Sequence, residues 1–168
     1  MESLSFPRSL ALSIQNMKVE VVTESLTNLE IAKRQLDRSI SLFFNEKDFV
    51  SSLTLAGAAE EILGKLLNKQ GVPHVMDEII KGSLALNDIE PGSPAEPKAK
   101  KSIAGMMNRF KNKLKHYNED ESITFSVDFY AAEMIDRAAQ NYFTLTADET
   151  ILMKRFKVEV MMGREGNA

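Results

Sequence analysis

Apolar residues recur at spacings of three and four along most of this chain, which restricts the folds open to it. From Thr23 to Glu46 they form one stripe, and the charged residues lie largely off it. The stripe consists of Leu29, Ala32, Leu36, Ile40, Phe43 and Phe44. Because an α-helix has about 3.6 residues per turn, such a stripe predicts a helix with one buried face. Thr23 or Ser25 is expected to cap its start.

The same spacing and the usual stop signals predict further helices. The second is followed by Gly71 and Pro73, which favour a helix end. In the helix predicted over residues 97–117, the fourth, apolar residues recur at spacings of four and three and are expected to form a buried seam. They are Ile103, Met107, Phe110, Leu114 and Tyr117. The predicted helices cover residues 48–69, 75–86, 97–117, 128–145 and 148–162. The fold class is therefore an all-α, up-and-down bundle of five to six helices.

The 168 residues are a one-domain length. We expect residues 23–162 to form the bundle and the proline-rich segment 87–97 to be a flexible loop. Residues 1–22 are open between a short helix and an extended segment, and residues 163–168 are expected to fray.

The composition limits the classes of function. The chain has no cysteine, which excludes disulfides and thiolate metal sites and suits a reducing, cytoplasmic compartment. No signal peptide, membrane span, metal site or cofactor is indicated. The net charge is −3, so contact with nucleic acid must come from a local basic patch.

Such a patch lies between Lys98 and His116, where no acidic residue occurs. It contains Lys98, Lys100, Lys101, Arg109, Lys111, Lys113 and Lys115. One interpretation is a solvated helix face whose acids come from neighbouring helices. The other is an anion site, most naturally for phosphate.

Helical spacing places Arg109, Asn112, Lys113 and His116 on one stripe of the fourth helix. Arg109 and His116 would lie about 10 Å apart along the axis. An arginine stabilises developing negative charge, a histidine transfers protons near neutral pH, and Asn112 could orient either the ring or the substrate. The acidic turn at Glu119–Glu121 is expected to raise the pKa of His116.

Two features of the other helices bear on this site. Glu60 lies toward the apolar side of its helix, and a half-buried carboxylate needs a partner. That partner is either a lysine or arginine of a neighbouring helix or one of the site candidates Arg109, Lys111 and His116. Glu60 and Glu61 are candidate supporting carboxylates of the site. The small residues Ala56, Gly57 and Gly64 predict close approach of another helix backbone, from this chain or a second copy, because a helical glycine costs about 1 kcal/mol. His74 is expected at the surface.

Two stretches, FVSSLTLAGAAEEILGKLL and NRFKNKLKHYNEDES, together resemble the HEPN superfamily. The resemblance is to a small-residue helix with a central glutamate and to a segment that carries Arg, Asn and His. It implies a helical bundle that pairs as a dimer. Many members of the superfamily are metal-independent ribonucleases, and some belong to bacterial toxin–antitoxin or defence systems, which would make an antitoxin a partner. Either Arg109 or Lys111 fills the arginine position of that segment. Lys111 directly precedes Asn112, as the arginine precedes the asparagine in the superfamily, but a lysine cannot form the two parallel hydrogen bonds of an arginine.

These observations predict an RNA- or nucleotide-binding protein. The resemblance implies a homodimer in which the basic helix either cleaves RNA without a metal or only binds it. Its catalytic residues would be Arg109 (or Lys111), Asn112 and His116, with Lys111, Lys113 and Lys115 binding the anion. The alternative is a non-catalytic dimerisation or protein-interaction module built on the small residues of the second helix.

Overall fold

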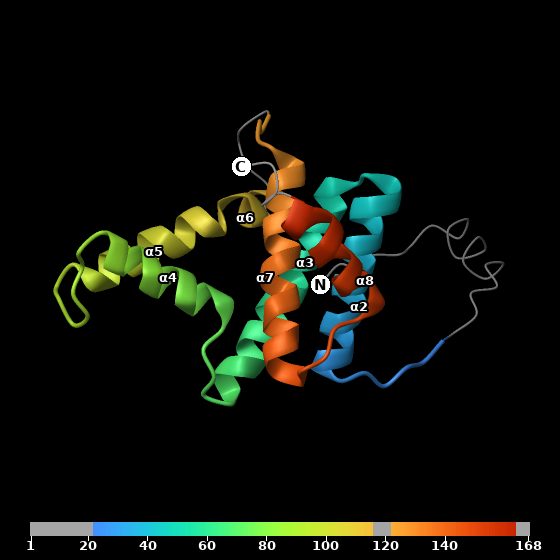
Figure 1. The fold of residues 1–168 in the computed structure, drawn as a ribbon, viewed down its shortest axis with the longest axis horizontal. Helices are drawn as coiled ribbons and strands as arrows, with labels where there is room; N and C mark the ends of the chain where they lie inside the picture. Colours follow the sequence, from blue (N-terminus) through green and yellow to red (C-terminus); the bar gives the residue numbers. More distant parts are fainter. Residues whose placement is uncertain (1–21, 116–121, 164–168) are drawn as a thin grey trace, which may run out of the picture.

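The computed structural model describes residues 22–115 and 122–163, whose regular structure is entirely helical (Figure 1). It has seven α-helices and two π-helical turns, η1 continuing α2 and η2 continuing α8. The bounds are α2 Asn28–Ser41, η1 Leu42–Glu46, α3 Phe49–Lys69, α4 Val75–Leu86, α5 Glu96–Met107, α6 Arg109–Lys115, α7 Val127–Thr146, α8 Ile151–Phe156 and η2 Lys157–Met162. The all-α prediction is confirmed, whereas the expectations for residues 1–21 and 164–168 lie outside the described residues.

Helix α2 begins later than predicted, because Thr27 is its N-cap. The Thr27 hydroxyl accepts a hydrogen bond from the Glu30 amide at 3.2 Å, and the Glu30 carboxylate accepts one from the Thr27 amide at 2.8 Å. This reciprocal capping box satisfies two amides that have no partner inside the helix. The caps proposed at Thr23 and Ser25 are therefore wrong.

The core lies where α2, α3 and α7 run side by side and α8 packs on them (Figure 1). Its central side chains are each at most 1% exposed, and they are Ala32, Leu36, Ile40, Leu53, Ala56, Ala59, Leu63, Ala131, Ile135, Ala138, Met153 and Phe156. Alanines on α3 and α7 allow these two helices to approach closely. Between α2 and α3, the hydroxyls of Ser39 and Ser52 each donate to the other residue's carbonyl, at 2.8 and 3.0 Å.

Helices α4 and α5 lie beside each other and project away from this core, with the turn-rich segment 87–95 at their far end (Figure 1). One link to the core is the Asn141 side chain of α7, which accepts from the Val75 amide at 2.9 Å. No residue of α5 is buried. The basic segment of the chain is thus held at the edge of the bundle.

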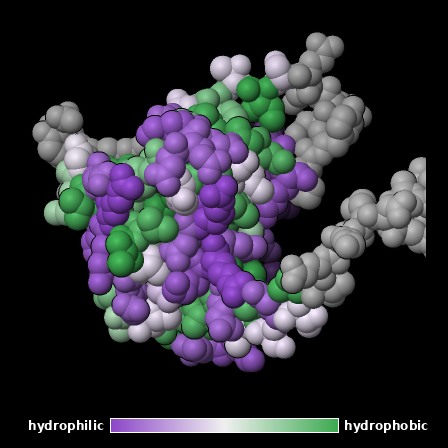
Figure 2. Space-filling view, turned by 90° about the vertical axis from the view of Figure 1, so that its right-hand side faces the viewer, coloured by the Kyte–Doolittle hydropathy of each residue, from purple (hydrophilic) through white to green (hydrophobic). Residues whose placement is uncertain are grey.

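The face seen in Figure 2 is mostly hydrophilic, with apolar residues confined to separate small patches. Among the described ranges, every helix is too short or too polar to serve as a membrane-spanning segment.

Candidate functional site

The helix predicted over residues 97–117 is broken at Asn108, which ends α5 with φ −103° and ψ 3°. The Arg137 guanidinium on α7 donates to the Asn108 side-chain oxygen at 3.2 Å and to the Met107 carbonyl at 3.4 Å. An α-helix leaves its last carbonyls without partners, so these bonds stabilise the break. Helix α6 then starts afresh at Arg109.

The predicted buried seam is only half-buried at Ile103, Met107, Phe110 and Leu114, and Tyr117 lies outside the described residues. The buried residue of α6 is instead Lys111, whose exposed fraction is 8%. The seam prediction is wrong because α5 and α6 lie against the edge of the bundle, where only one side of α6 meets α3.

Lys111 is buried because it joins Glu60 and Arg137 in an ion cluster at the junction of α3, α6 and α7. The Lys111 ammonium lies 3.1 Å from one Glu60 oxygen, and the Arg137 guanidinium lies 2.5 Å from the other. Glu60 is 5% exposed and Arg137 3% exposed. We refer to these three residues as the buried ion cluster.

The charges of the cluster compensate the cost of burying them. Burial raises the pKa of Glu60, but attraction from Arg137 and Lys111 and their hydrogen bonds outweigh it, so the pKa lies below its ordinary value of 4.5. Glu60 therefore stays ionised at neutral pH and balances one of the two cations. Removing one member of such a cluster is far more costly than losing a surface ion pair.

Gly57 provides the space that Lys111 occupies. A Cβ atom at position 57 would lie 2.5 Å from the Lys111 Cδ and 2.8 Å from its Cγ, closer than van der Waals contact permits. A Cβ at Gly64 would lie 3.4 Å from the His74 ring. We expected another helix backbone to pack against both glycines, but side chains of the same chain lie there. Ala56 is fully buried.

The structure separates the predicted anion-binding residues into distinct environments. Arg109 and Asn112 are exposed, one turn apart on α6, and the Arg109 Cζ lies 5.5 Å from the centre of the Phe110 ring. Lys113 is half-buried, and the Lys115 ammonium lies 3.7 Å from Glu61. Lys111 is buried, and its ammonium is bound to Glu60.

His116 and the acidic turn at Glu119–Glu121 lie outside the described residues, so the spacing between Arg109 and His116 stays a prediction. Glu60 does have the expected partners, because both an ordinary cation, Arg137, and the site candidate Lys111 contact it. Glu61 lies at the surface, where hydrogen bonding to Lys65 is the main cause of its lowered pKa.

Arg137 was not predicted from the sequence as a site residue. A signal was present, because Met134, Arg137 and Asn141 follow one another at three and four residues and all three are buried on α7. An arginine at helical spacing from Met134, beside the apolar face of this helix, is a candidate for a buried ion pair.

His74, which was predicted at the surface, is half-buried. It is the N-cap of α4, its Nδ1 accepts from the Met76 amide at 3.2 Å, and its side chain is 17% exposed. It has the structural role of ending one connection and starting a helix.

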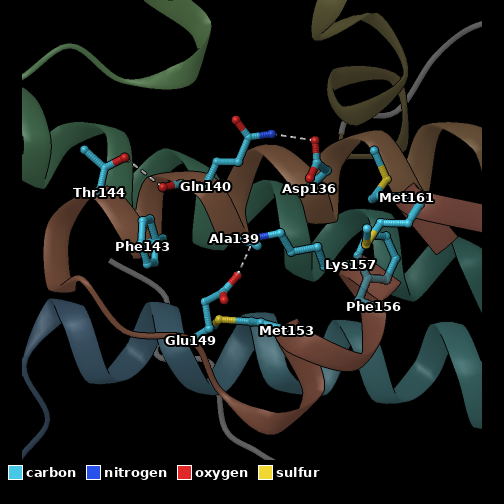
Figure 3. Close-up of a pocket in the computed structure, with 11 residues that line it drawn as sticks. Asp136, Ala139, Gln140, Phe143, Thr144, Glu149, Met153, Phe156, Lys157 and Met161 are labelled. Atoms are coloured by element: carbon cyan, nitrogen blue, oxygen red, sulfur yellow. Dashed lines mark hydrogen bonds and ion pairs between the residues drawn. The ribbon is translucent and has the colours of Figure 1, made fainter. Parts of the chain in front are cut away.

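A separate cavity of about 530 Å³ lies between α7 and the segment 149–162 (Figure 3). Apolar side chains such as Phe143, Met153 and Phe156 line it, together with an ion pair between Lys157 and Glu149 at 3.5 Å. Burial raises the pKa of Asp136 at its edge. None of its lining residues comes from α5 or α6, so this cavity is distinct from the basic segment.

Comparison with known proteins adds no assignment to this geometry. No family model, curated protein or solved structure matches the chain.

Proposed function

We propose that this protein binds RNA or a nucleotide through three exposed cations of α5 and α6, Lys98, Lys101 and Arg109. The observation that carries the proposal is their lack of ion pairs. None of the three pairs with a carboxylate of the described residues, whereas Lys100 pairs with Glu96 at 2.6 Å. By contrast, the cations of α2, Lys33, Arg34 and Arg38, all pair with an acidic side chain.

Lys98, Lys101 and Arg109 lie in a stretch, from Lys98 to Lys115, that contains no acidic residue. In a chain with net charge −3, this local excess of positive charge favours a polyanionic ligand. Phosphates provide that charge, and binding releases their condensed counterions. Arg109 adds a planar fork that can bind one phosphate through two parallel hydrogen bonds.

The binding proposal is tested with a labelled single-stranded RNA in a fluorescence-anisotropy titration. The triple variant Lys98→Gln, Lys101→Gln, Arg109→Gln is expected to bind more weakly than the unaltered protein. The matched control, Arg34→Gln, Lys69→Gln, Lys154→Gln, makes the same change in net charge at other exposed cations. Equal weakening in both variants would show that only net charge matters, which contradicts a site on α5 and α6.

We further propose metal-independent ribonuclease activity in a HEPN-like homodimer. Its support is that Arg109 and Asn112 share the exposed side of α6, the helix that leads into His116. Arg109, and not the buried Lys111, would then stabilise the phosphoryl charge, while His116 transfers the proton.

This activity is measured as RNA cleavage in the presence of a metal chelator. His116→Ala and Arg109→Ala are both expected to abolish cleavage while the protein stays folded by circular dichroism. Cleavage that persists unchanged in His116→Ala would come from a contaminating nuclease and would refute the catalytic proposal, though not the binding one.

A further inference from the structure

An apolar cavity of about 270 Å³ lies between α6 and α7, and Met106, Phe110 and Lys111 of the basic segment are among its lining residues. Met106 and Phe129 lie at its edge, with exposed fractions of 65% and 46%. Phe110 and Tyr130 form part of its wall. Large apolar side chains that stay this exposed around a cavity are typical of a binding site.

Aromatic packing holds the wall of this cavity in place. The Phe110 ring stacks on Phe125 with centres 4.3 Å apart and planes 9° apart, and it lies 4.4 Å from Tyr130. Phe129 meets Tyr130 edge to face at 5.4 Å. A ligand with a flat ring would therefore meet a preformed aromatic surface.

The charged residues of the cavity argue against a phosphate inside it. Lys111 and Arg137 line it, but both are bound to Glu60, and Glu133 adds a further carboxylate to the wall. The Arg137 Nε–H is buried without a hydrogen-bond partner among the described residues. A neutral group with an acceptor atom suits this wall better than an anion does.

Arg109 lies next to the cavity, because its guanidinium carbon is 5.5 Å from the centre of the ring of Phe110, which lines the cavity. A phosphate held by Arg109 would thus place the attached nucleotide near the cavity. We infer that the cavity receives one unpaired base of a single-stranded RNA, which stacks on its aromatic residues. This inference rests on the proposed RNA binding and specifies single-stranded over duplex RNA, since paired bases cannot enter the cavity.

The first test compares the affinity of Phe129→Ala for a single-stranded RNA with that of Phe143→Ala. Both residues are exposed phenylalanines of α7, 46% and 51% respectively, and they lie about 21 Å apart along the helix. Phe129→Ala is expected to weaken binding at least about fivefold, because stacking of one base contributes about 1–3 kcal/mol. Phe143→Ala, the matched control, is expected to leave the affinity unchanged.

A second test needs no variant. Duplex RNA has the higher charge density, so contact with phosphates alone predicts that the duplex binds at least as tightly as a single strand of the same sequence. Base insertion predicts that the single strand binds more tightly.

Three outcomes are distinguishable. Selective weakening by Phe129→Ala, together with preference for the single strand, supports the inference. Equal affinities of the two phenylalanine variants, with no preference for the single strand, would overturn base insertion and leave the proposed RNA binding intact. If the unaltered protein binds no RNA, the proposed function and this inference both fail.

Discussion

The contact between Gly57 and Lys111 makes a strong prediction, because one methyl group should have opposite effects in two backgrounds. Gly57→Ala places a Cβ 2.5 Å from the Lys111 Cδ. The Lys111 side chain cannot simply move away, since it is buried and its ammonium lies 3.1 Å from Glu60. Inserting a methyl group into such a packed site costs about 1–3 kcal/mol.

The opposing term is helix propensity. Alanine is favoured over glycine in a helix interior by about 1 kcal/mol. The net effect of Gly57→Ala is therefore a loss of about 0–2 kcal/mol from the free energy of unfolding. In a Lys111→Ala background the atoms that clash are absent, and only the Lys111 Cβ remains at 3.9 Å. There Gly57→Ala is expected to stabilise the protein by about 1 kcal/mol.

The assay is a double-mutant cycle measured by urea denaturation. The expected coupling between the two positions is about 1–3 kcal/mol, the overpacking term alone. If Gly57→Ala changes the free energy of unfolding equally in both backgrounds, the coupling is zero. That result would refute the packing of Lys111 against Gly57.

Two further predictions concern the buried ion cluster and the start of α2. Glu60 has a lowered pKa in the folded protein, so its carboxylate stabilises the fold fully above about pH 4.5 and less as the pH falls through the folded-state pKa. Glu60→Gln, which leaves Lys111 and Arg137 without their shared carboxylate, is expected to lower the free energy of unfolding by about 3–5 kcal/mol at neutral pH. In urea denaturation this difference should shrink with acid; a difference that is independent of pH contradicts the role of the charge. Thr27→Ala removes the capping hydroxyl and is expected to cost about 1 kcal/mol, and an unchanged thermal midpoint would contradict the capping box.

Local signals predicted most of the helical boundaries. Helix α3 ends at Lys69 because Gly71, with φ +69°, takes the left-handed conformation that glycine allows, and Pro73 follows. The start of α2 was also readable, because Thr27 and Glu30 have the spacing of a capping box. Thr23 and Ser25 are followed three residues later by Leu26 and Asn28, which cannot complete one.

The site was less predictable because contacts distant in sequence determine it. The break at Asn108 depends on Arg137, which is 29 residues away. Lys111 is buried because Glu60, 51 residues away, binds it and Gly57 leaves room for it. Helical periodicity reports which residues share a face but not which neighbouring helix that face meets, so the seam at Phe110 and Leu114 was assigned too much burial.

The salt dependence of RNA binding tests the central claim most directly. Each phosphate contact with a single strand contributes about 0.7 to the slope of log affinity against log salt concentration. Removing Lys98, Lys101 and Arg109 together should therefore make the slope shallower by about 2, while the Arg34, Lys69 and Lys154 control keeps the slope of the unaltered protein. Identical slopes in all three proteins would contradict binding of RNA by α5 and α6.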